Sequence, residues 1–254
     1  MSDRCATSKK DDTYDLAVIG AGSAGFSAAI TAVEQGARVA LIGRGAIGGT
    51  CVNVGCVPSK TMIRAAEALY GARAASRFDG IVGEARVVDW PRVIAAKDEL
   101  VAGLRQKKYV ELLPQYEGIG YIEGAARLAD GGVAVSDMIV GAPKIVITTG
   151  ARPAVPPIPG LEKVRYLTST SLLELDALPK SLIVVGGGFI GAELAQMIAR
   201  MGVDVTMVCR SRLLPQTEPE VSDALMDEFR REGMRLHCGV AYDVCREDAS
   251  GVTL

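Results

Sequence analysis

Short apolar runs alternate with longer stretches of helical periodicity along most of the chain. The run over 14–19 predicts a strand, and a helix is predicted to follow a glycine-rich turn and to end near Gln35, with Gly36 as its C-cap. A second strand is predicted over 38–42. Strand, glycine loop, helix and strand in this order indicate an α/β domain with a parallel sheet.

The pattern changes in the middle of the chain. A long helix is predicted from an N-cap at Asp89, with Pro91 in its first turn, to about Leu113. From 119 to 147, short β segments separated by glycines predict a small antiparallel excursion. It is expected to end in a buried strand over 144–148.

The proline-rich segment over 153–160 predicts a crossing into a second domain. Beyond it, a strand over 181–185, a glycine loop, a helix to Arg200 and a strand over 203–208 repeat the order of the first domain. The expected fold class is therefore α/β with two Rossmann-like dinucleotide-binding domains. The predicted division of the chain is a disordered leader over 1–13, a first domain over 14–150 that includes the cysteine-bearing helix, and a second, incomplete domain over 151–254.

Both strand-to-helix turns carry a G-x-G-x-x-G motif, over 20–25 and over 186–191. In the first motif, Gly20 permits a tight turn, Gly22 lets the backbone approach a pyrophosphate, and Gly25 allows close helix packing. The N-terminus of the following helix faces the phosphate charge. The candidate cofactor-binding residues of the two loops are Gly20, Gly22, Ser23, Ala24 and Gly25 in the first and Gly186, Gly188, Phe189, Ile190 and Gly191 in the second.

The acidic residue that normally ends the second strand of such a unit and binds the ribose hydroxyls is missing from both domains. Gly43 holds that position in the first domain, and Cys209 followed by Arg210 holds it in the second. An arginine there can accept a 2′-phosphate, so Arg210 favours NADPH over NADH. The alternative for Arg210 is an ordinary solvated surface charge.

Two cysteines, Cys51 and Cys56, lie in the most distinctive stretch of the sequence, over 48–60. If Thr50 opens a helix, both thiols lie in its first turn, near or past the roughly 7 Å limit on the Cα separation of a disulfide. Gly55 and the proline at 58 would bend this turn enough for the sulfurs to meet.

The helix start makes these thiols reactive, because its partial positive charge favours the thiolate. Lys60, four residues after Cys56, adds a cation on the same helical face. We therefore predict that Cys51 and Cys56 form a redox-active pair. The alternative is an inert, buried cysteine pair.

Composition limits the functional classes. The 254 residues carry a net charge of -2 and are 49% hydrophobic, which is enough for about two domains. Lysine and arginine form no basic stripe, so no nucleic-acid partner is expected. The sequence contains no apolar run of the roughly 18 residues that suggest a membrane span and no signal peptide at its start. Six cysteines without framework spacing suit a reducing compartment, so a cytoplasmic protein is expected.

Taken together, the two glycine motifs, the segment 49–60 and the pair Thr149-Gly150 resemble the pyridine nucleotide-disulfide oxidoreductases. This family includes glutathione reductase, dihydrolipoyl dehydrogenase and mercuric reductase. The resemblance covers nearly the whole chain after about Tyr14. Within the family it is strongest to the mercuric reductases, on the stretches 61–67, 78–80, 155–161 and 166–170.

The resemblance implies a site. FAD would lie along the first domain, and NADPH would bind the second glycine loop. Cys56 would be the thiol against the flavin and Cys51 the interchange thiol. Lys60 and Glu193 match the family's ion pair beside the flavin, and Phe189 occupies the position where relatives often carry a tyrosine gate over the ring. The residues implied near FAD are Gly25, Gly45, Thr50, Lys60 and Ala126, and Gly150 and Glu193 are further candidate cofactor-binding residues.

The implied reaction is reduction of Hg(II), free or as its thiol complexes, to Hg(0). NADPH would reduce FAD, the flavin would open the disulfide between Cys51 and Cys56, and these thiolates would bind the soft metal. The alternatives are a dihydrolipoyl dehydrogenase or glutathione-reductase-like enzyme, and a chain that binds FAD or metal without turnover.

Family members continue into the rest of the FAD domain and an interface domain that forms a homodimer, whereas this sequence ends at 254. A C-terminally truncated sequence is therefore expected, with the homodimer a property of the full-length protein. The only histidine, His237, is predicted to be a strand residue.

Overall fold

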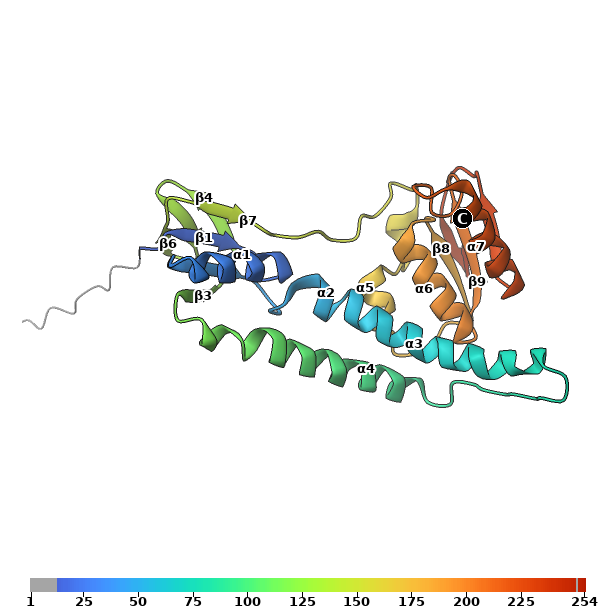
Figure 1. Ribbon diagram of the computed structural model, residues 1–254. Helices are drawn as coiled ribbons and strands as arrows, with labels where there is room; N and C mark the ends of the chain where they lie inside the picture. Colours follow the sequence, from blue (N-terminus) through green and yellow to red (C-terminus); the bar gives the residue numbers. More distant parts are fainter. Residues whose placement is uncertain (1–12, 250) are drawn as a thin grey trace, which may run out of the picture. The chain divides into compact units, whose positions relative to one another are not determined.

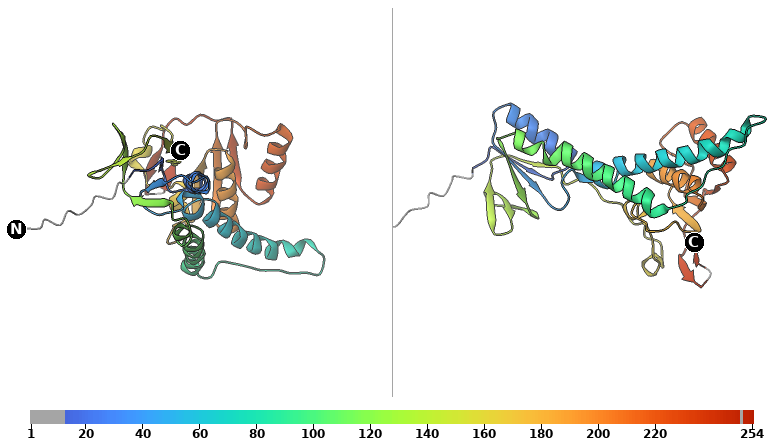
Figure 2. Two further views of the ribbon diagram at one scale, coloured as in Figure 1. Left: turned by 60° about the vertical axis from the view of Figure 1, so that its left-hand side comes forward. Right: turned by 90° about the horizontal axis from the view of Figure 1, so that it is seen from below.

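The computed structural model describes residues 13–249 and 251–254 and is shown in Figures 1 and 2. Internal contacts divide it into two compact units. The first consists of the chain up to Asn53 together with Ala102–Ala151, and the second of Val54–Val101 together with Arg152–Leu254. The predicted leader lies outside the described residues except for Thr13, which forms a β-bridge with Gly141.

The first unit is built on a four-stranded parallel sheet in the order β3-β2-β1-β7. All five residues of β2 are buried, as expected for a central strand covered on both faces. Helix α1 packs Phe26 and Ala29 into a cluster with the sheet. The strands are β1 (Leu16–Ile19), β2 (Val39–Gly43), β3 (Ile119–Glu123) and β7 (Ile145–Ile147), and α1 covers Ser23–Glu34.

The predicted antiparallel excursion over 119–147 is correct only in its middle. The antiparallel sheet contains β4 (Ala126–Ala129), β5 (Gly132–Val135) and β6 (Met138–Gly141), whereas β3 and β7 join the parallel sheet. β7 is an edge strand, so Ile145 and Ile147 are exposed instead of buried. Periodicity does not distinguish a parallel edge strand from a hairpin strand, because both are short apolar runs.

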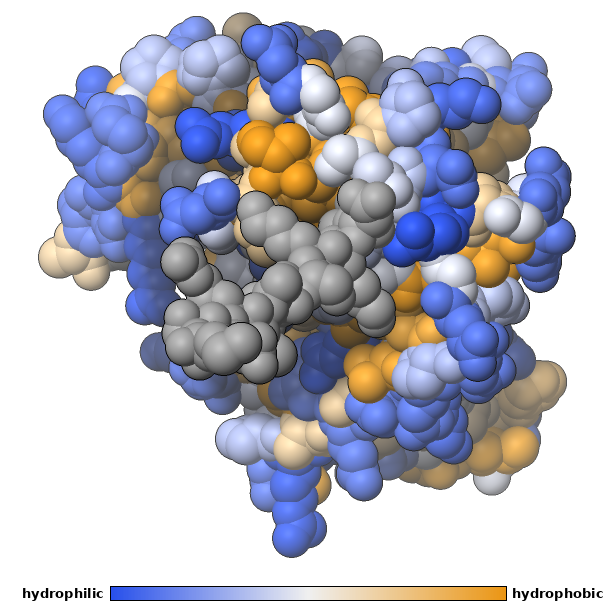
Figure 3. Space-filling model, turned by 90° about the vertical axis from the view of Figure 1, so that its left-hand side faces the viewer, coloured by the Kyte–Doolittle hydropathy of each residue, from blue (hydrophilic) through white to orange (hydrophobic). Residues whose placement is uncertain are grey.

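Several large apolar side chains of the first unit remain at the surface. The side of the molecule drawn in Figure 3 carries apolar (orange) side chains among hydrophilic (blue) ones. The exposed ones in the strands of this unit include Leu128, Met138, Ile139 and Ile147.

Helix α4 (Trp90–Arg105) contains the boundary between the units, since Val101 belongs to the second and Ala102 to the first. The predicted N-cap is confirmed, because the Asp89 carboxylate accepts a hydrogen bond from Arg92 N at 3.1 Å. The regular helix ends earlier than predicted. It continues as a π-helical turn, η2 (Gln106–Val110), and then a 3-10 turn, η3 (Leu113–Gln115).

The second unit has a three-stranded parallel sheet in the order β10-β9-β8. Figure 1 shows α6 between this sheet and α3, and Met62 of α3 lies in one core cluster with Ile198 of α6 and Met207 of β9. The strands are β8 (Ser181–Val185), β9 (Asp204–Cys209) and β10 (Arg235–Cys238), and the helices are α3 (Cys56–Arg73), α5 (Ser169–Leu172), α6 (Phe189–Arg200) and α7 (Pro219–Arg231).

Shorter elements complete this unit. They are the 3-10 turns η1 (Ala74–Arg77) and η4 (Leu161–Lys163) and the antiparallel pair β11 (Arg246–Asp248) and β12 (Gly251–Thr253). As predicted, His237 is a strand residue, in β10, and the structure shows that it is exposed. The expected fold class is confirmed, since each unit has a parallel sheet in which a glycine loop joins a strand to a helix.

Candidate functional site

The first glycine loop joins β1 to α1 and is closed by Thr148. Gly20 has φ +118°, and a Cβ there would lie 2.2 Å from the carbonyl oxygen of Thr148. The Thr148 hydroxyl lies 3.0 Å from the carbonyl oxygens of Ile19 and Gly20, to one of which it donates at a time. A Cβ at Gly25 would lie only 1.8 Å from Gly20 O. Only glycine fits at positions 20 and 25.

The start of α1 is open to an anion. Its N-cap is Gly22, and within the described residues no side chain caps the first turn and none of its residues is acidic. Gly22 forms a bridge with Gly48, and a Cβ on Gly49 would lie 2.6 Å from Gly22 Cα. The first-turn N–H groups and the positive end of the helix dipole therefore suit a pyrophosphate, with the start of α2 against the same loop.

The second glycine loop joins β8 to α6 and is more open. Gly186 has φ +112°, but a Cβ there would meet no described atom within 4 Å. The N-cap is Gly188, again without a side-chain cap among the described residues. Phe189 and Ile190 at the helix start are exposed. This loop also fits a phosphate group, because backbone donors are available and the space around Gly188 is free.

The segment after β9 is fixed to the second glycine loop. Leu214 N donates to Gly187 O at 2.7 Å, and Leu214 adopts a left-handed conformation, with φ 45°. A Cβ on Gly187 would lie 3.2 Å from Cys209 Cβ. The residues that follow β9 are thus held beside the phosphate loop.

This segment carries two arginines. Arg210 is exposed at the end of β9, where the sequence predicts a 2′-phosphate contact. Arg212 was not predicted; its Nη2 donates to Thr217 O, while its Nη1 is buried and has no hydrogen-bond partner among the described residues. An unsatisfied buried guanidinium nitrogen is uncommon, since buried donors are normally paired. The signal in the sequence was a second arginine two positions after the first.

The cysteine-bearing segment forms two helices, so the prediction of one helix opened near Thr50 with both thiols in its first turn is wrong. Helix α2 (Gly49–Asn53) contains Cys51, and α3 begins at Cys56. Gly55 between them has φ -127° and ψ -113°, outside the helical region. The chain turns by ending one helix and starting another, as glycine allows.

The surroundings of the two cysteines differ. Cys51 is half-buried, whereas Cys56 is exposed at the start of α3, whose first turn has no side-chain cap among the described residues. Asn53, which the sequence analysis missed, donates to the carbonyl oxygens of Ile47 and Gly49 at 2.9 Å each. It also accepts a hydrogen bond from Arg105 at 3.0 Å. Asn53 therefore holds the loop that leads into α2.

Lys60 and Glu193 form an ion pair between α3 and α6, as the family resemblance implies. Lys60 Nζ lies 2.5 Å from Glu193 Oε2, and the two side chains are 54% and 46% exposed. They border a pocket of about 310 Å³ whose polar lining also includes Arg64, Gln196 and Arg200. The ion pair thus gives Glu193 of α6 a charged partner on α3.

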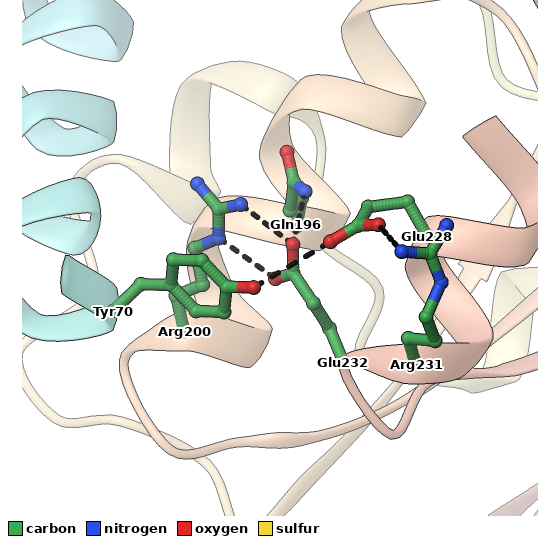
Figure 4. A network of polar contacts seen from close by, with 6 residues as sticks. All are labelled: Tyr70, Gln196, Arg200, Glu228, Arg231 and Glu232. Atoms are coloured by element: carbon green, nitrogen blue, oxygen red, sulfur yellow. Dashed lines mark hydrogen bonds and ion pairs between the residues drawn. The ribbon is translucent and has the colours of Figure 1, made fainter. Parts of the chain in front are cut away.

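A buried charged network, not foreseen from the sequence, connects α3, α6 and the end of α7 (Figure 4). Arg200 donates from Nε to one oxygen of Glu232 at 2.7 Å, and Gln196 donates to the other at 2.7 Å. This hydrogen bonding raises the pKa of Arg200 above its usual value. The guanidinium carbon lies 4.2 Å from the ring centre of Tyr70. Glu232 is 4% exposed, so it depends on these partners for its charge.

The remaining predicted cofactor-binding residues belong to the first unit. Gly45 and Gly150 are exposed, with φ +76° and +72°, after β2 and β7 respectively. Thr50 is exposed in α2, and Ala126 is half-buried in β4. Lys60 belongs to the second unit, with Glu193.

Residues 13–249 and 251–254 contain neither a candidate metal-ion centre nor a candidate membrane span. This part of the chain holds no group of three or more His, Cys, Asp or Glu residues arranged to bind a metal ion. None of the helices described there is both long enough and apolar enough to cross a bilayer.

Comparison with known proteins places the chain in a family. The chain is 46% identical to the mercuric reductase of Streptomyces lividans over 94% of its length and 43% identical to that of Staphylococcus aureus over 96%. These matches cover 52% and 45% of the two relatives, so the chain spans about half their length.

A solved structure of a related protein also matches this chain over about half of that protein's length. The Cu(II) complex of the HOCl-induced flavoprotein disulfide reductase RclA from Escherichia coli matches with a TM-score of 0.81 and 31% identity, over 94% of this chain and 52% of that one. The family model for pyridine nucleotide-disulphide oxidoreductases matches residues 14–254. The chain therefore belongs to the pyridine nucleotide-disulfide oxidoreductase family.

Proposed function

We propose that this chain is part of an NADPH-dependent flavoprotein that reduces Hg(II) to Hg(0). The observation that carries the proposal is an exposed cysteine, Cys56, at an uncapped helix start one turn before the Lys60–Glu193 ion pair. It occurs in a sequence 46% identical to a mercuric reductase. In this proposal residues 14–150 supply the FAD domain and residues 151–254 the NADPH domain.

FAD fits the first loop. Gly22 leaves the N–H groups of the first turn of α1 without side-chain caps, and Gly20 and Gly25 keep that turn tight. We assign Ser23 and Ala24 to the same phosphate contact, and Gly45, Thr50, Ala126 and Gly150 to the rest of the cofactor. Bound FAD would supply two-electron transfer between the nucleotide and the thiols, while the protein supplies binding and orientation.

NADPH fits the second loop. Gly186, Gly188 and Gly191 give its backbone the same access, and the exposed Phe189 and Ile190 would cover the bound nucleotide. Arg210 would bind the 2′-phosphate, because a guanidinium makes charge-assisted contacts with phosphate that it does not make with a hydroxyl. The buried, unpaired Nη1 of Arg212 supports an anion site in this segment.

Cys51 and Cys56 would act as the dithiol that receives the metal. Soft thiolates bind soft metals. Two thiols that bind free Hg(II) release two protons, whereas two thiols that take Hg(II) from a thiol complex pass their protons to the two thiolates that leave. Cys56 is the first residue of α3, so it lies at the positive end of the helix dipole. Lys60, held by Glu193, adds a positive charge on the same helix face one turn further on.

The whole protein would be a cytoplasmic homodimer without a nucleic-acid or membrane partner. The -2 net charge and the scattered lysines and arginines support the absence of a nucleic-acid partner, since nucleic-acid sites need clustered positive charge.

A disulfide reductase is the second candidate. The RclA structure, a flavoprotein disulfide reductase by its description, matches the fold at a TM-score of 0.81. Such an enzyme would use the same two cofactors and the same cysteines. It would differ only in passing electrons to a disulfide such as that of glutathione or lipoamide.

The test is NADPH-dependent release of Hg(0) by the full-length protein that contains this chain. Cys56→Ala should abolish turnover, whereas Cys245→Ala, at a buried cysteine packed against Ile158 and Val164, should leave it unchanged. Unchanged Hg(0) release by Cys56→Ala would contradict the assignment of that thiol. Turnover with glutathione disulfide or lipoamide but not with Hg(II) would favour the second candidate.

The 254-residue chain by itself is expected to show little steady-state mercury reduction, and binding of dinucleotide or metal without turnover is the alternative role for it. Purified chain should contain substoichiometric flavin and should bind Hg(II) through Cys51 and Cys56. A fully flavinylated chain with sustained Hg(0) release would contradict this expectation.

A further inference from the structure

Two other cysteines lie at the ends of neighbouring strands in the second unit. Cys209 ends β9, Cys238 ends β10, and the two are direct partners in the parallel register. Neighbouring strands lie about 4.7–4.9 Å apart. This spacing falls within the roughly 4.4–6.8 Å range of Cα separations that a disulfide bridges. The backbone therefore already suits a covalent bond between them.

The two sulfur atoms already face each other. Cys209 Sγ lies 3.0 Å from Cys238 Sγ and also 3.0 Å from the carbonyl oxygen of Ser211. A disulfide bond is about 2.05 Å long, so the sulfurs need to approach by about 1 Å.

The two thiols differ in access to a reagent. Cys209 is 3% exposed, whereas Cys238 is half-buried. Burial raises the pKa of the Cys209 thiol to about 12, so this group stays protonated at neutral pH. A reagent from solution therefore reaches Cys238 first, and Cys209 reacts from inside the protein.

We propose that Cys209 and Cys238 form a second redox dithiol, which hydrogen peroxide closes to a disulfide. Cys238 first takes one peroxide oxygen as the O–O bond breaks, which gives a sulfenic acid and one water. Cys209 then attacks the Cys238 sulfur; the S–S bond forms, the S–O bond breaks, and the hydroxyl leaves with the Cys209 proton as a second water. Two thiols lose two electrons, and the peroxide gains them.

This modification site is separate from the proposed mercury reaction. It uses neither Cys51 nor Cys56 and does not depend on the function proposed above. The disulfide would join the end of β9, next to Arg210, to the end of β10. The disulfide would thereby be a covalent product of exposure to peroxide in the second unit.

The experiment uses the chain with Cys51→Ser and Cys56→Ser, so that only the second pair is scored. The protein is treated with graded hydrogen peroxide, unfolded, alkylated with iodoacetamide and digested with trypsin. The expected product is peptide 201–210 joined to peptide 236–246, two hydrogens lighter than the sum of the separate peptides and separated again by dithiothreitol. Recovery of Cys209 and Cys238 both alkylated, at peroxide doses that oxidise exposed thiols, would overturn the proposal.

Two variants identify the cysteines involved. Peptide 236–246 also contains Cys245, so Cys245→Ser should keep the cross-link, and Cys238→Ser should abolish it. A cross-link that disappears in Cys245→Ser but survives in Cys238→Ser would show that Cys209 bonds to Cys245 and not to Cys238. This result would overturn the proposal. The linked peptide from protein with both cysteines intact is decisive even if a variant folds poorly.

Discussion

Helices α1 and α6 differ more at their C-terminal ends than at their N-terminal ends. Each has 12 residues, and each begins at a glycine N-cap without a side-chain cap among the described residues. α1 has no basic residue in its last turn, whereas α6 ends in Arg200, which is paired with Glu232. The common start fits a shared need for free N–H groups at a phosphate. The difference between the C-terminal ends of the two helices follows from the residues that pack against each end within its own unit.

The glycines of the two loops also act differently. At Gly20 an added Cβ would collide with Thr148, whereas at Gly186 the positive φ is the only obstacle. A Cβ at Gly25 would lie 1.8 Å from a carbonyl oxygen, and one at the matching Gly191 would lie 2.7 Å from one. Packing therefore excludes other side chains from the glycine positions of the first loop, whereas backbone conformation is the main obstacle in the second loop.

The largest expected effect concerns the end of α6. Glu232→Ala leaves Arg200 partly buried without its partner, so we expect the free energy of unfolding to fall by about 3–5 kcal/mol. Asp227→Ala, which removes an exposed ion pair with Arg230, is the control and should change it by less than about 1 kcal/mol. Urea denaturation of both variants measures this. Equal effects would mean that burial of the pair is unimportant.

A smaller effect separates the two loops. Gly25→Ala should destabilise the first unit by about 1–3 kcal/mol or more, because neither the helix nor the loop can move away from the new Cβ. Gly191→Ala should have a milder effect. Gly71→Ala, in α3 with open space around it, should be neutral or stabilising by about 0.5–1 kcal/mol. Thermal unfolding followed by circular dichroism ranks the three, and a larger loss for Gly191→Ala would reverse the comparison.

Nucleotide choice tests the role given to the second loop. Wild-type full-length protein should prefer NADPH, and Arg210→Glu should lower kcat/KM for NADPH by about 10- to 100-fold, as expected for the loss of a charged hydrogen bond. The value of kcat/KM for NADH should change much less. Arg246→Glu, on the exposed strand β11, is the control. Equal use of the two nucleotides by the wild type would remove the basis for the 2′-phosphate contact.

The smallest effect is a pH dependence. The pKa of Cys209 is raised from 9.0 to about 12, so the folded protein keeps a proton that the unfolded chain releases. The contribution of the protonated Cys209 thiol to the free energy of unfolding is therefore fully present below about pH 9 and is lost as the pH rises toward 12. Burial also raises the pKa of Tyr121 and Tyr242, so the wild type should be compared with Cys209→Val, whose stability should fall less. Parallel curves would rule out this contribution.

In both units, the order of strand, glycine loop and helix could be predicted from local sequence signals. The motif at Gly20 and that at Gly186 each lie within a few residues of the elements they connect, so periodicity and turn chemistry determine both. The break at Gly55 was missed because the sequence also permits one bent helix, and tertiary contacts such as that between Asn53 and Arg105 select the alternative.

Other features depend on residues distant in sequence. Cys209 and Cys238 are brought together only by the register of β9 and β10, and Glu232 meets Arg200 only after α7 has packed. No local pattern contains that information. The Lys60–Glu193 pair was anticipated through the family resemblance and not through spacing, since 133 positions separate the two residues.

The hydrogen bond from Leu214 to Gly187 has a consequence for protein engineering. It holds Leu214, in a left-handed conformation, against the second glycine loop, so the conformations of the segment from Arg210 to Leu214 and of the loop depend on each other. If Arg210 binds the 2′-phosphate as proposed, a designer who wishes to change the coenzyme preference should exchange this segment and the loop together. A point substitution at Arg210 alone would leave the contact between Leu214 and Gly187 unchanged.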